Sequence, residues 1–258
     1  RFRTHTVGPS AIQPVGEQMS VYYGEGAYAM PAEMTEAEIA QVIQGFADTA
    51  ARAVDTANFD GIEIHGANGY LLDQFLTAHT NLRTDRWGGD MKHRVRLLID
   101  VVTAVKERVG HEVPVGVRIS QGKVNDFNSK WPNGETDAHT IFGALADAGV
   151  DFIHVTEYEA WQPAFEGGKD SLITLARKCA PGITIIGNGN LHDPVQAVEA
   201  LDAGADLIAL GRGALSNPDY PLILSTNQTF REFDASILQP IADIKGSELA
   251  LEQESQSH

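Results

Sequence analysis

The sequence predicts an α/β fold in which a parallel sheet closes into a (β/α) barrel. One pattern recurs, in which a small residue ends a helix and an Asp precedes a short apolar strand: DTANFDGIEIH (55–65), DAGVDFIHVT (147–156) and DAGADLIALG (202–211). Short apolar runs are typical of strands buried on both faces, as in parallel sheets. Strands that alternate with helices through right-handed crossovers form either a barrel or a doubly wound sheet.

The ends of the expected strands favour the barrel. Polar or Gly-rich residues follow each strand, in chain order His65-Gly66, Arg118-Ile119-Ser120, Thr156-Glu157, Gly187-Asn188-Gly189 and Gly211-Arg212-Gly213. In a (β/α) barrel these carboxyl ends together form the active-site face.

Two further strands and five helices are expected along the chain. Besides the three repeats, the runs 115–119 and 183–186 have the length and β-branched content of buried strands, which makes five strands. Helices are expected between them, over 36–53, 92–108, 138–148, 172–179 and 195–203. The first begins with the capping box TEAE (35–38), and the last begins with DP (193–194), an acceptor before a first-turn proline.

Composition limits the class of protein and of partner. The chain has 258 residues, 43% of them hydrophobic, which suffices for one large α/β domain or two small ones. Its 19 basic and 35 acidic residues give a net charge of −16, which would repel phosphate backbones and anionic membranes. We therefore expect neither nucleic acid nor a membrane as partner.

Cysteine content and targeting signals bear on location. A single cysteine, Cys179, excludes an internal disulfide framework and a Cys-based zinc or iron–sulfur site, which fits a reducing compartment. No apolar run approaches about 20 residues, and RFRTHTVGPSAIQP (1–14) lacks the apolar core of a secretion signal. The expected location is cytoplasmic. The polar ALEQESQSH (250–258) is expected to be a frayed tail.

Two glycine motifs at the last two strand ends predict a phosphate site. GNGN (187–190) and GRG (211–213) follow consecutive strands. Loops at these positions of a barrel often hold phosphate through backbone N–H groups, which glycine lets a ligand approach, and an adjacent cation. Either motif alone is equally well explained as a tight turn. Their pairing, with Arg212 as a charge-assisted partner, favours a ligand.

The stretch IEIHGANGYLLDQFL (62–76) places His65, Asn68 and Tyr70 on Gly and Ala spacers where a strand ends. Side chains alternate along a strand, so His65 and Glu63 should face the same way. The small spacers would let the three hydrogen-bonding groups converge on one ligand. On the residues alone, a structural His and a core Tyr are the commoner explanations.

The stretch HGANGYLLDQFLTAHTNLRTDRWGGDMKHRVRL (65–97) resembles the flavin-dependent ene-reductases of the Old Yellow Enzyme family. Their motif reads H-x-A-[NH]-G-Y-L, then N-x-R-x-D-x-[YW]-G-G, then an R-x-R helix start. The resemblance runs from PSAI (9–12) through FDGIEIHGA, VGVRIS and GNGN to LGRGALSNPD, and covers about residues 7–222. Trp87 replaces a commoner Tyr, and DMKH (90–93) replaces a more usual S-x-x-N, which affects local loop contacts. The segment 231–250 resembles bacterial NADH-dependent flavin oxidoreductases.

The resemblance implies an eight-stranded TIM barrel, of which this chain supplies the last five strands. Residues 1–222 would be the C-terminal portion of an FMN-binding barrel, and residues 223–258 a C-terminal extension and tail. Family members carry FMN at the barrel mouth, take a hydride from NADH or NADPH, and pass it to an activated alkene. The implied partner is a small α,β-unsaturated carbonyl or nitro compound, and a homo-oligomer is left open.

The resemblance also implies roles for individual residues. His65 and Asn68 would donate hydrogen bonds to the carbonyl or nitro oxygen, where charge develops. Tyr70 would deliver a proton to the α-carbon. Arg118 would contact the pyrimidine edge of the flavin and could also pair with Glu63. The expected phosphate site consists of Gly187, Asn188, Gly211 and Arg212.

Three strands precede the matching segment in the family, and five strands cannot close a standard eight-stranded barrel. Residues outside this sequence could complete the barrel, the chain could be a fragment that pairs with another, or it could be degenerate. We expect the first, because the expected site residues of this portion are all present. Two other functions stay open. One is a different phosphate-binding barrel enzyme, such as an isomerase or aldolase, and the other is a flavin-free remnant.

Overall fold

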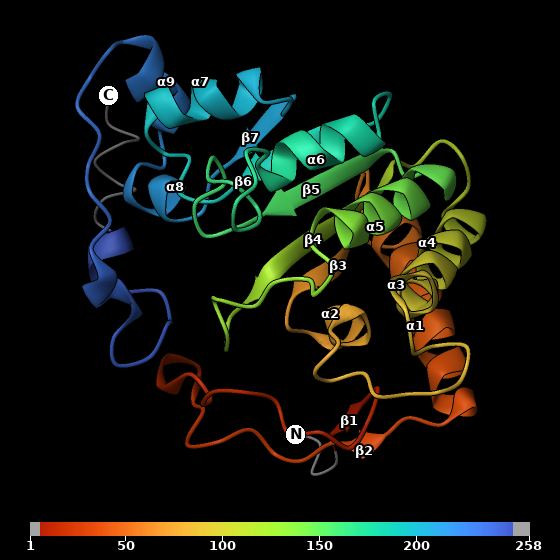
Figure 1. The fold of residues 1–258 in the computed structure, drawn as a ribbon. Helices are drawn as coiled ribbons and strands as arrows, with labels where there is room; N and C mark the ends of the chain where they lie inside the picture. Colours follow the sequence, from red (N-terminus) through yellow and green to blue (C-terminus); the bar gives the residue numbers. More distant parts are fainter. Residues whose placement is uncertain (1–5, 250–258) are drawn as a thin grey trace.

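A five-stranded parallel sheet forms the centre of the computed structural model, which describes residues 6–249. The strands lie side by side in chain order, β3-β4-β5-β6-β7 (Figure 1). Their bounds are β3 Ile62–Asn68, β4 Val115–Lys123, β5 Phe152–Thr156, β6 Thr184–Asn188 and β7 Leu207–Ala209. All five predicted strands are therefore confirmed, and their parallel order is that of consecutive strands in a (β/α) barrel.

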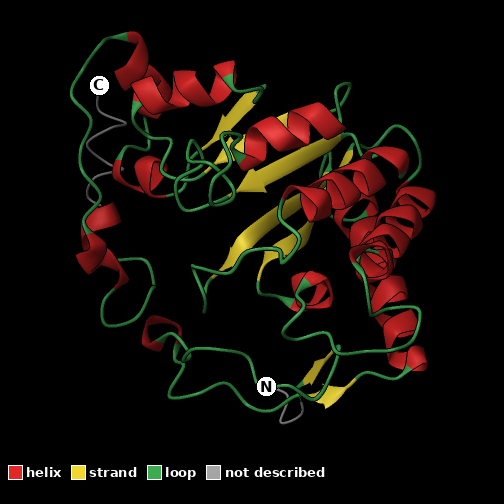
Figure 2. Cartoon of the chain, in the orientation of Figure 1, coloured by secondary structure: helices red, strands yellow, loops and turns green. Residues whose placement is uncertain are grey.

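Helices alternate with these strands, and the long helices gather along one side of the sheet (Figure 2). They are α1 Glu36–Asp55, α4 Arg96–Val109, α5 Glu135–Asp147, α6 Leu172–Cys179 and α7 Pro194–Asp202. The prediction of one helix over 92–108 is wrong. The chain forms α3 Met91–Arg94 and then α4, because Val95 takes a ψ of −15°, which tightens the turn and interrupts the helix.

Several short elements were not predicted. They are the two-residue parallel pair β1 Val7–Gly8 and β2 Ala32–Glu33, the helices α2 Leu71–Leu76, α8 Arg212–Ser216 and α9 Tyr220–Ser225, and the 3₁₀ turns η1 Ser20–Tyr22 and η2 Ala235–Leu238. Elements of two to six residues are too short for hydrophobic periodicity to reveal. The predicted frayed tail, residues 250–258, lies outside the described residues.

The Asp of the repeated sequence pattern joins successive β-α units. Asp151 Oδ2 accepts hydrogen bonds from the backbone N of Val115, at 2.8 Å, and from Lys106 Nζ, at 3.0 Å. Asp206 Oδ2 likewise accepts from the backbone N of Ile185 at 2.8 Å. Each carboxylate thus binds the start of the preceding strand, which explains why an Asp precedes the strand at both joints.

Alternation along the strands separates the core from the opposite face of the sheet. Ile64, Val117, Ile153 and Ile185 are cross-strand neighbours, and all are at most 2% exposed in the hydrophobic core. The next residue along each strand points to the other face. There, His65, Arg118 and His154 form the adjacent cross-strand row. The sheet register therefore brings three polar side chains together on one face.

The edges of the sheet are β3 and β7. Within residues 6–249, each of these two strands pairs with a single neighbour. No helix in the described part of the chain is long and apolar enough to cross a membrane.

Candidate active site

A cluster of ionisable side chains lies on the face of the sheet opposite the long helices. It consists of Glu63, His65, Arg118 and His154. Glu63 Oε2 accepts a hydrogen bond from His154 Nδ1 at 2.8 Å. Among residues 6–249, no ion pair joins Glu63 to Arg118, so the pairing considered from the sequence is replaced by Glu63 with His154. The reason lies in the register, which places His154 beside Arg118 and within reach of the Glu63 carboxylate.

The cluster determines the charge of its members. Burial first, and then the positive charge of Arg118, lower the pKa of His65 below its usual value. The lowered pKa favours the neutral imidazole, whose ring N–H can donate a hydrogen bond. Burial opposes the ionisation of Glu63, but the His154 hydrogen bond and the nearby positive charges together hold the pKa of Glu63 below its usual range.

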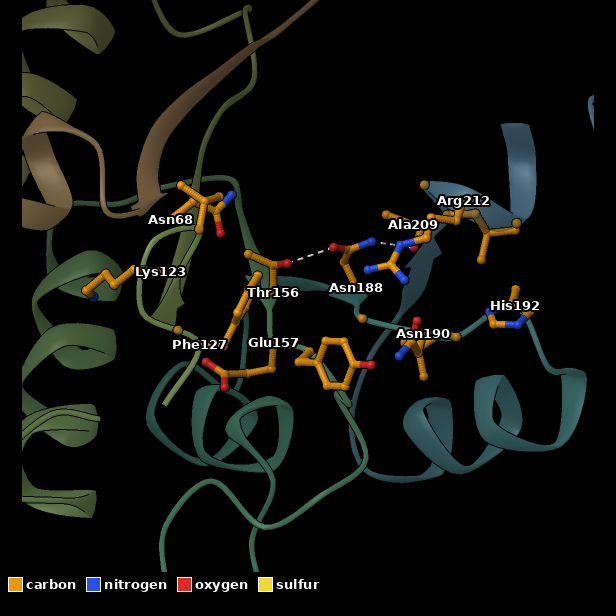
Figure 3. Close-up of a pocket in the computed structure, with 18 residues that line it drawn as sticks. Asn68, Lys123, Phe127, Thr156, Glu157, Asn188, Asn190, His192, Ala209 and Arg212 are labelled. Atoms are coloured by element: carbon orange, nitrogen blue, oxygen red, sulfur yellow. Dashed lines mark hydrogen bonds between the residues drawn. The ribbon is translucent and has the colours of Figure 1, made fainter. Parts of the chain in front are cut away.

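Arg118 begins a hydrogen-bond chain that crosses four strands. Its Nη2 donates to Thr156 Oγ1 at 3.2 Å and to Asn188 Oδ1 at 3.0 Å. Thr156 Oγ1 donates to the same Asn188 oxygen at 2.7 Å, and Asn188 Nδ2 donates to the backbone oxygen of Ala209 at 2.8 Å (Figure 3). Within the described chain, the Arg118 Nε is buried and has no hydrogen-bond partner. A buried unpaired donor is costly, and the described chain supplies no partner for this atom.

A cavity of about 230 Å³ opens beside this chain, at the carboxyl ends of β4, β5, β6 and β7. Arg212 projects into it from the start of α8 toward Asn188 (Figure 3). In the described part of the chain, Arg212 forms no ion pair, so its charge is available to an anion. Besides these two residues, the lining comes from the segments 122–124, 156–158, 189–192 and 209–213, together with Asn68 and Phe127.

Glycine backbone lies close to other atoms at two points of the lining. A Cβ on Gly189 would lie 1.9 Å from the backbone oxygen of Glu157, and φ at Gly189 is +138°. A Cβ on Gly213 would lie 2.6 Å from Cβ of His192. Only glycine fits at either position, because a side chain there would collide with the neighbouring loop.

The predicted phosphate residues do not all lie on the cavity. Asn188, Gly211 and Arg212 line it. Gly187 does not line the cavity. A Cβ on Gly187 would instead lie 2.9 Å from Ile173 Cδ1 of α6. Close packing of the strand against α6 is thus a sufficient reason for glycine at 187.

The structure brings Asn68 and Tyr70 together at a second cavity of about 260 Å³. Asn68 lines both cavities, and Tyr70, 56% exposed, lines the second beside Met19 and Tyr22 of the N-terminal segment. The rings of His65 and Tyr70 lie 5.3 Å apart between centroids. Thus the three candidate catalytic side chains are neighbours, although His65 lines neither cavity.

Sequence reasoning missed several side chains of the site. Phe127 and Tyr158, with ring centroids 6.4 Å apart, lie on the loops after β4 and β5. Loop residues carry no periodicity, so no local signal selected them. Within residues 6–249, no group of three or more His, Cys, Asp and Glu side chains could hold a metal ion.

Comparisons with known proteins agree with this geometry. The family described as NADH:flavin oxidoreductase / NADH oxidase matches residues 2–229. The NADH oxidase of Thermoanaerobacter brockii is 35% identical over 199 residues, which are 74% of this chain and 30% of that protein. The chain thus spans less than a third of that relative's length.

Two solved structures are similar over almost the whole chain. The Old Yellow Enzyme homologue from Zymomonas mobilis superposes with a TM-score of 0.81 at 28% identity, over 95% of this chain and 67% of that one. Morphinone reductase in complex with tetrahydroNAD superposes with a TM-score of 0.76 at 29% identity, over 91% and 63%. The chain therefore spans about two thirds of each structure.

Proposed function

The chain belongs to the NADH:flavin oxidoreductase / NADH oxidase family, that of Old Yellow Enzyme, and on this premise we propose that it forms the active-site portion of an FMN-dependent ene-reductase. The enzyme transfers a hydride from NADH or NADPH to the activated C=C bond of an α,β-unsaturated carbonyl or nitro compound. The observation that carries this proposal is the position of His65, Asn68 and Tyr70. They lie at and just after the end of β3, and Asn68 also lines the cavity that contains Arg212 and the glycine loops.

The residues present fit FMN. Arg212, which has no ion pair within the described chain, and the backbone of Gly211 would hold the phosphate, with Asn188 beside them. The buried, unpaired Nε of Arg118 would meet an acceptor on the flavin ring. A cation near that ring favours negative charge on its reduced form. Bound FMN supplies the carrier that accepts the hydride from the nicotinamide and donates it to the alkene.

The chain's own residues then act on the substrate. His65 and Asn68 donate hydrogen bonds to its carbonyl or nitro oxygen, and the neutral imidazole of His65 provides one of these donors. Donors fixed in advance at an oxygen where charge develops stabilise the transition state. Tyr70 gives its phenolic proton to the α-carbon as the hydride arrives at the β-carbon.

Anaerobic half-reactions test the proposal on a polypeptide that carries this chain together with the strands that complete the barrel. The purified protein should absorb in the flavin bands, lose that absorbance when NADH or NADPH is added, and regain it with cyclohexenone or a nitroalkene. A protein that takes up no FMN, or whose reduced flavin is not reoxidised by any activated alkene, would contradict it.

His65→Ala and Asn68→Ala should each slow alkene reduction by about 10²-fold, because each change removes one donor to the developing oxyanion. Each should also weaken the charge-transfer complex with a phenol, as measured by titration. FMN should stay bound, since neither residue belongs to the loops after β6 and β7. His79→Ala, at an exposed site, is the matched control. Unchanged reoxidation rates in both variants would refute the assignment.

A further inference from the structure

Asp73 and Lys123 form a buried ion pair that the proposed reaction does not use. Lys123 Nζ lies 2.8 Å from Asp73 Oδ1, and the two side chains are 6% and 0% exposed. Asp73 belongs to α2, and Lys123 is the last residue of β4. Lys123 Nζ also donates to the backbone oxygen of Gln121 at 2.8 Å.

The second carboxylate oxygen of Asp73 contacts the turn that carries two candidate catalytic residues. Asp73 Oδ2 accepts a hydrogen bond from the backbone N of Gly69 at 2.7 Å. Gly69 lies between Asn68 and Tyr70. The ion pair is therefore linked through one peptide group to both of these residues.

This turn has an unusual backbone. Asn68 and Gly69 have φ values of +62° and +85°, both in the left-handed region. A Cβ on Gly69 would lie 2.8 Å from Asn125 Oδ1 and 3.3 Å from Lys123 Cβ, and the φ of +85° would strain any residue other than glycine. A non-glycine residue in this region costs free energy, and it persists only where the surroundings hold it.

The other contacts of the turn come mostly from the end of β4. The backbone N of Asn68 donates to Ser120 Oγ at 2.9 Å, and the backbone N of Val124 donates to the oxygen of Asn68 at 3.2 Å. Gln74 Nε2, on α2, donates to the oxygen of Gly69 at 2.9 Å. Asp73 is the acceptor for the Gly69 N–H in this set of contacts.

Stability does not explain the ion pair. Replacing a buried ion pair with apolar side chains of similar volume is often neutral or stabilising, because both charges lose their hydration. An apolar pair, however, would leave the Gly69 N–H without its acceptor. A carboxylate that accepts from a backbone N–H forms a short and strong hydrogen bond.

We propose that Asp73 and Lys123 are positioning residues, which hold the turn 68–70 so that the Asn68 amide and the Tyr70 phenol face the substrate. Lys123 binds and orients the Asp73 carboxyl group, and Asp73 fixes Gly69. This inference rests on the roles proposed above for Asn68 and Tyr70.

Two double variants separate positioning from stability. Asp73→Asn with Lys123→Met removes both charges but keeps a side-chain oxygen for the Gly69 N–H. Asp73→Leu with Lys123→Met removes both charges and the acceptor. Asp73→Ala with Lys123→Met is a second acceptor-free variant, in case the larger Leu side chain prevents folding. All three are made in the full-length protein.

The readouts include one that does not depend on the flavin. Hydrogen exchange of the peptide 66–76 reports the protection of the Gly69 amide. Stopped-flow reoxidation by an enone and titration with a phenol report the geometry of Tyr70 and Asn68. Thermal unfolding and FMN content show whether each variant is folded and loaded.

The acceptor-free variants should exchange the Gly69 amide at least tenfold faster, and reduce enones about tenfold or more slowly, since small misplacements of catalytic groups are costly. The variant with Asp73→Asn and Lys123→Met should keep the exchange rate of the Gly69 amide and the rate of enone reduction close to wild type. Equal losses in all the double variants, or losses in none, would overturn the proposal. If the wild-type protein reduces no alkene, the proposed function fails, whereas the exchange experiment still decides whether Asp73 anchors the turn.

Discussion

His65 lies beside Arg118 in the polar row of the sheet, and this neighbour determines its charge. Burial and the Arg118 guanidinium both disfavour the imidazolium form, so the folded protein lowers the pKa of His65. A donor that is neutral near pH 7 avoids placing a second full positive charge beside Arg118. The same shift makes His65 a source of pH-dependent stability.

The sign of that dependence follows from the direction of the shift. His65 binds its proton more weakly in the folded than in the unfolded chain, where its pKa is about 6.5. Its contribution to stability is therefore present above about pH 6.5 and is lost as pH falls through the lower folded pKa. His65→Gln should flatten the dependence of the unfolding temperature on pH between about 7.5 and 5. A slope equal to that of wild type would contradict the depressed pKa.

Tyr70→Phe should separate the two half-reactions. Flavin reduction by the nicotinamide cofactor should proceed near the wild-type rate, because it needs no proton from Tyr70. Reduction of enones should slow by roughly 10² or more, since the α-carbon loses its proton donor. Nitroalkenes should suffer less, because their nitronate product is stable without immediate protonation. Equal losses in both half-reactions, measured by stopped flow, would indicate a structural role for Tyr70.

Asp151 and Asp206 each link the strand that follows them to the strand before it. Asp151 lies just before β5 and binds the first residue of β4, and Asp206 lies just before β7 and binds the second residue of β6. These contacts fix the register between adjacent strands. The register in turn determines which side chains lie side by side at the carboxyl ends of the strands.

Asp151→Ala should lower the free energy of unfolding by about 1–2 kcal/mol, because the backbone N–H of Val115 loses its acceptor. Urea denaturation measures the change. Asp147→Ala, at an exposed residue of the same joint, should change it by less than about 0.5 kcal/mol. Equal effects of the two changes would show that the Val115 contact contributes nothing specific.

In the whole molecule, the loops proposed to hold phosphate and the side chains proposed to bind substrate lie on one five-stranded sheet with edges at β3 and β7. The similar solved structures are longer than this chain, which covers 67% and 63% of them. A closed eight-stranded barrel has strands on all sides of its mouth. The sheet described here supplies one side of such a mouth.

Residues 1–258 alone should therefore bind FMN weakly compared with a polypeptide that also carries the strands completing the barrel. Adding those strands, in the same chain or as a separate piece, should restore a yellow and active protein. In the completed protein Arg212→Ala should release FMN, since a charge-assisted hydrogen bond contributes about 1.5–3 kcal/mol. Fluorescence titration with FMN measures each affinity. Stoichiometric FMN and enone reduction by residues 1–258 alone would refute this prediction.

The sequence by itself predicted the elements whose signals are local. Five short apolar runs gave the five strands, because strands covered on both faces carry few polar residues. The capping box at Thr35 and the Asp193 cap before Pro194 both form as predicted, since each needs only residues within one helical turn. The predicted site residues also come from short motifs at strand ends. A parallel sheet brings the carboxyl ends of its strands to the same edge.

Only the tertiary structure decided which side chains are partners. Glu63 pairs with His154, 91 residues away, and Asp73 pairs with Lys123, 50 residues away. Arg118 contacts Thr156 and Asn188, although the sequence offered Glu63 as readily. Partner choice at such separations depends on the register between strands and on the packing of α2 against the sheet. Both arise from the summed burial of many side chains, which no single stretch of sequence encodes.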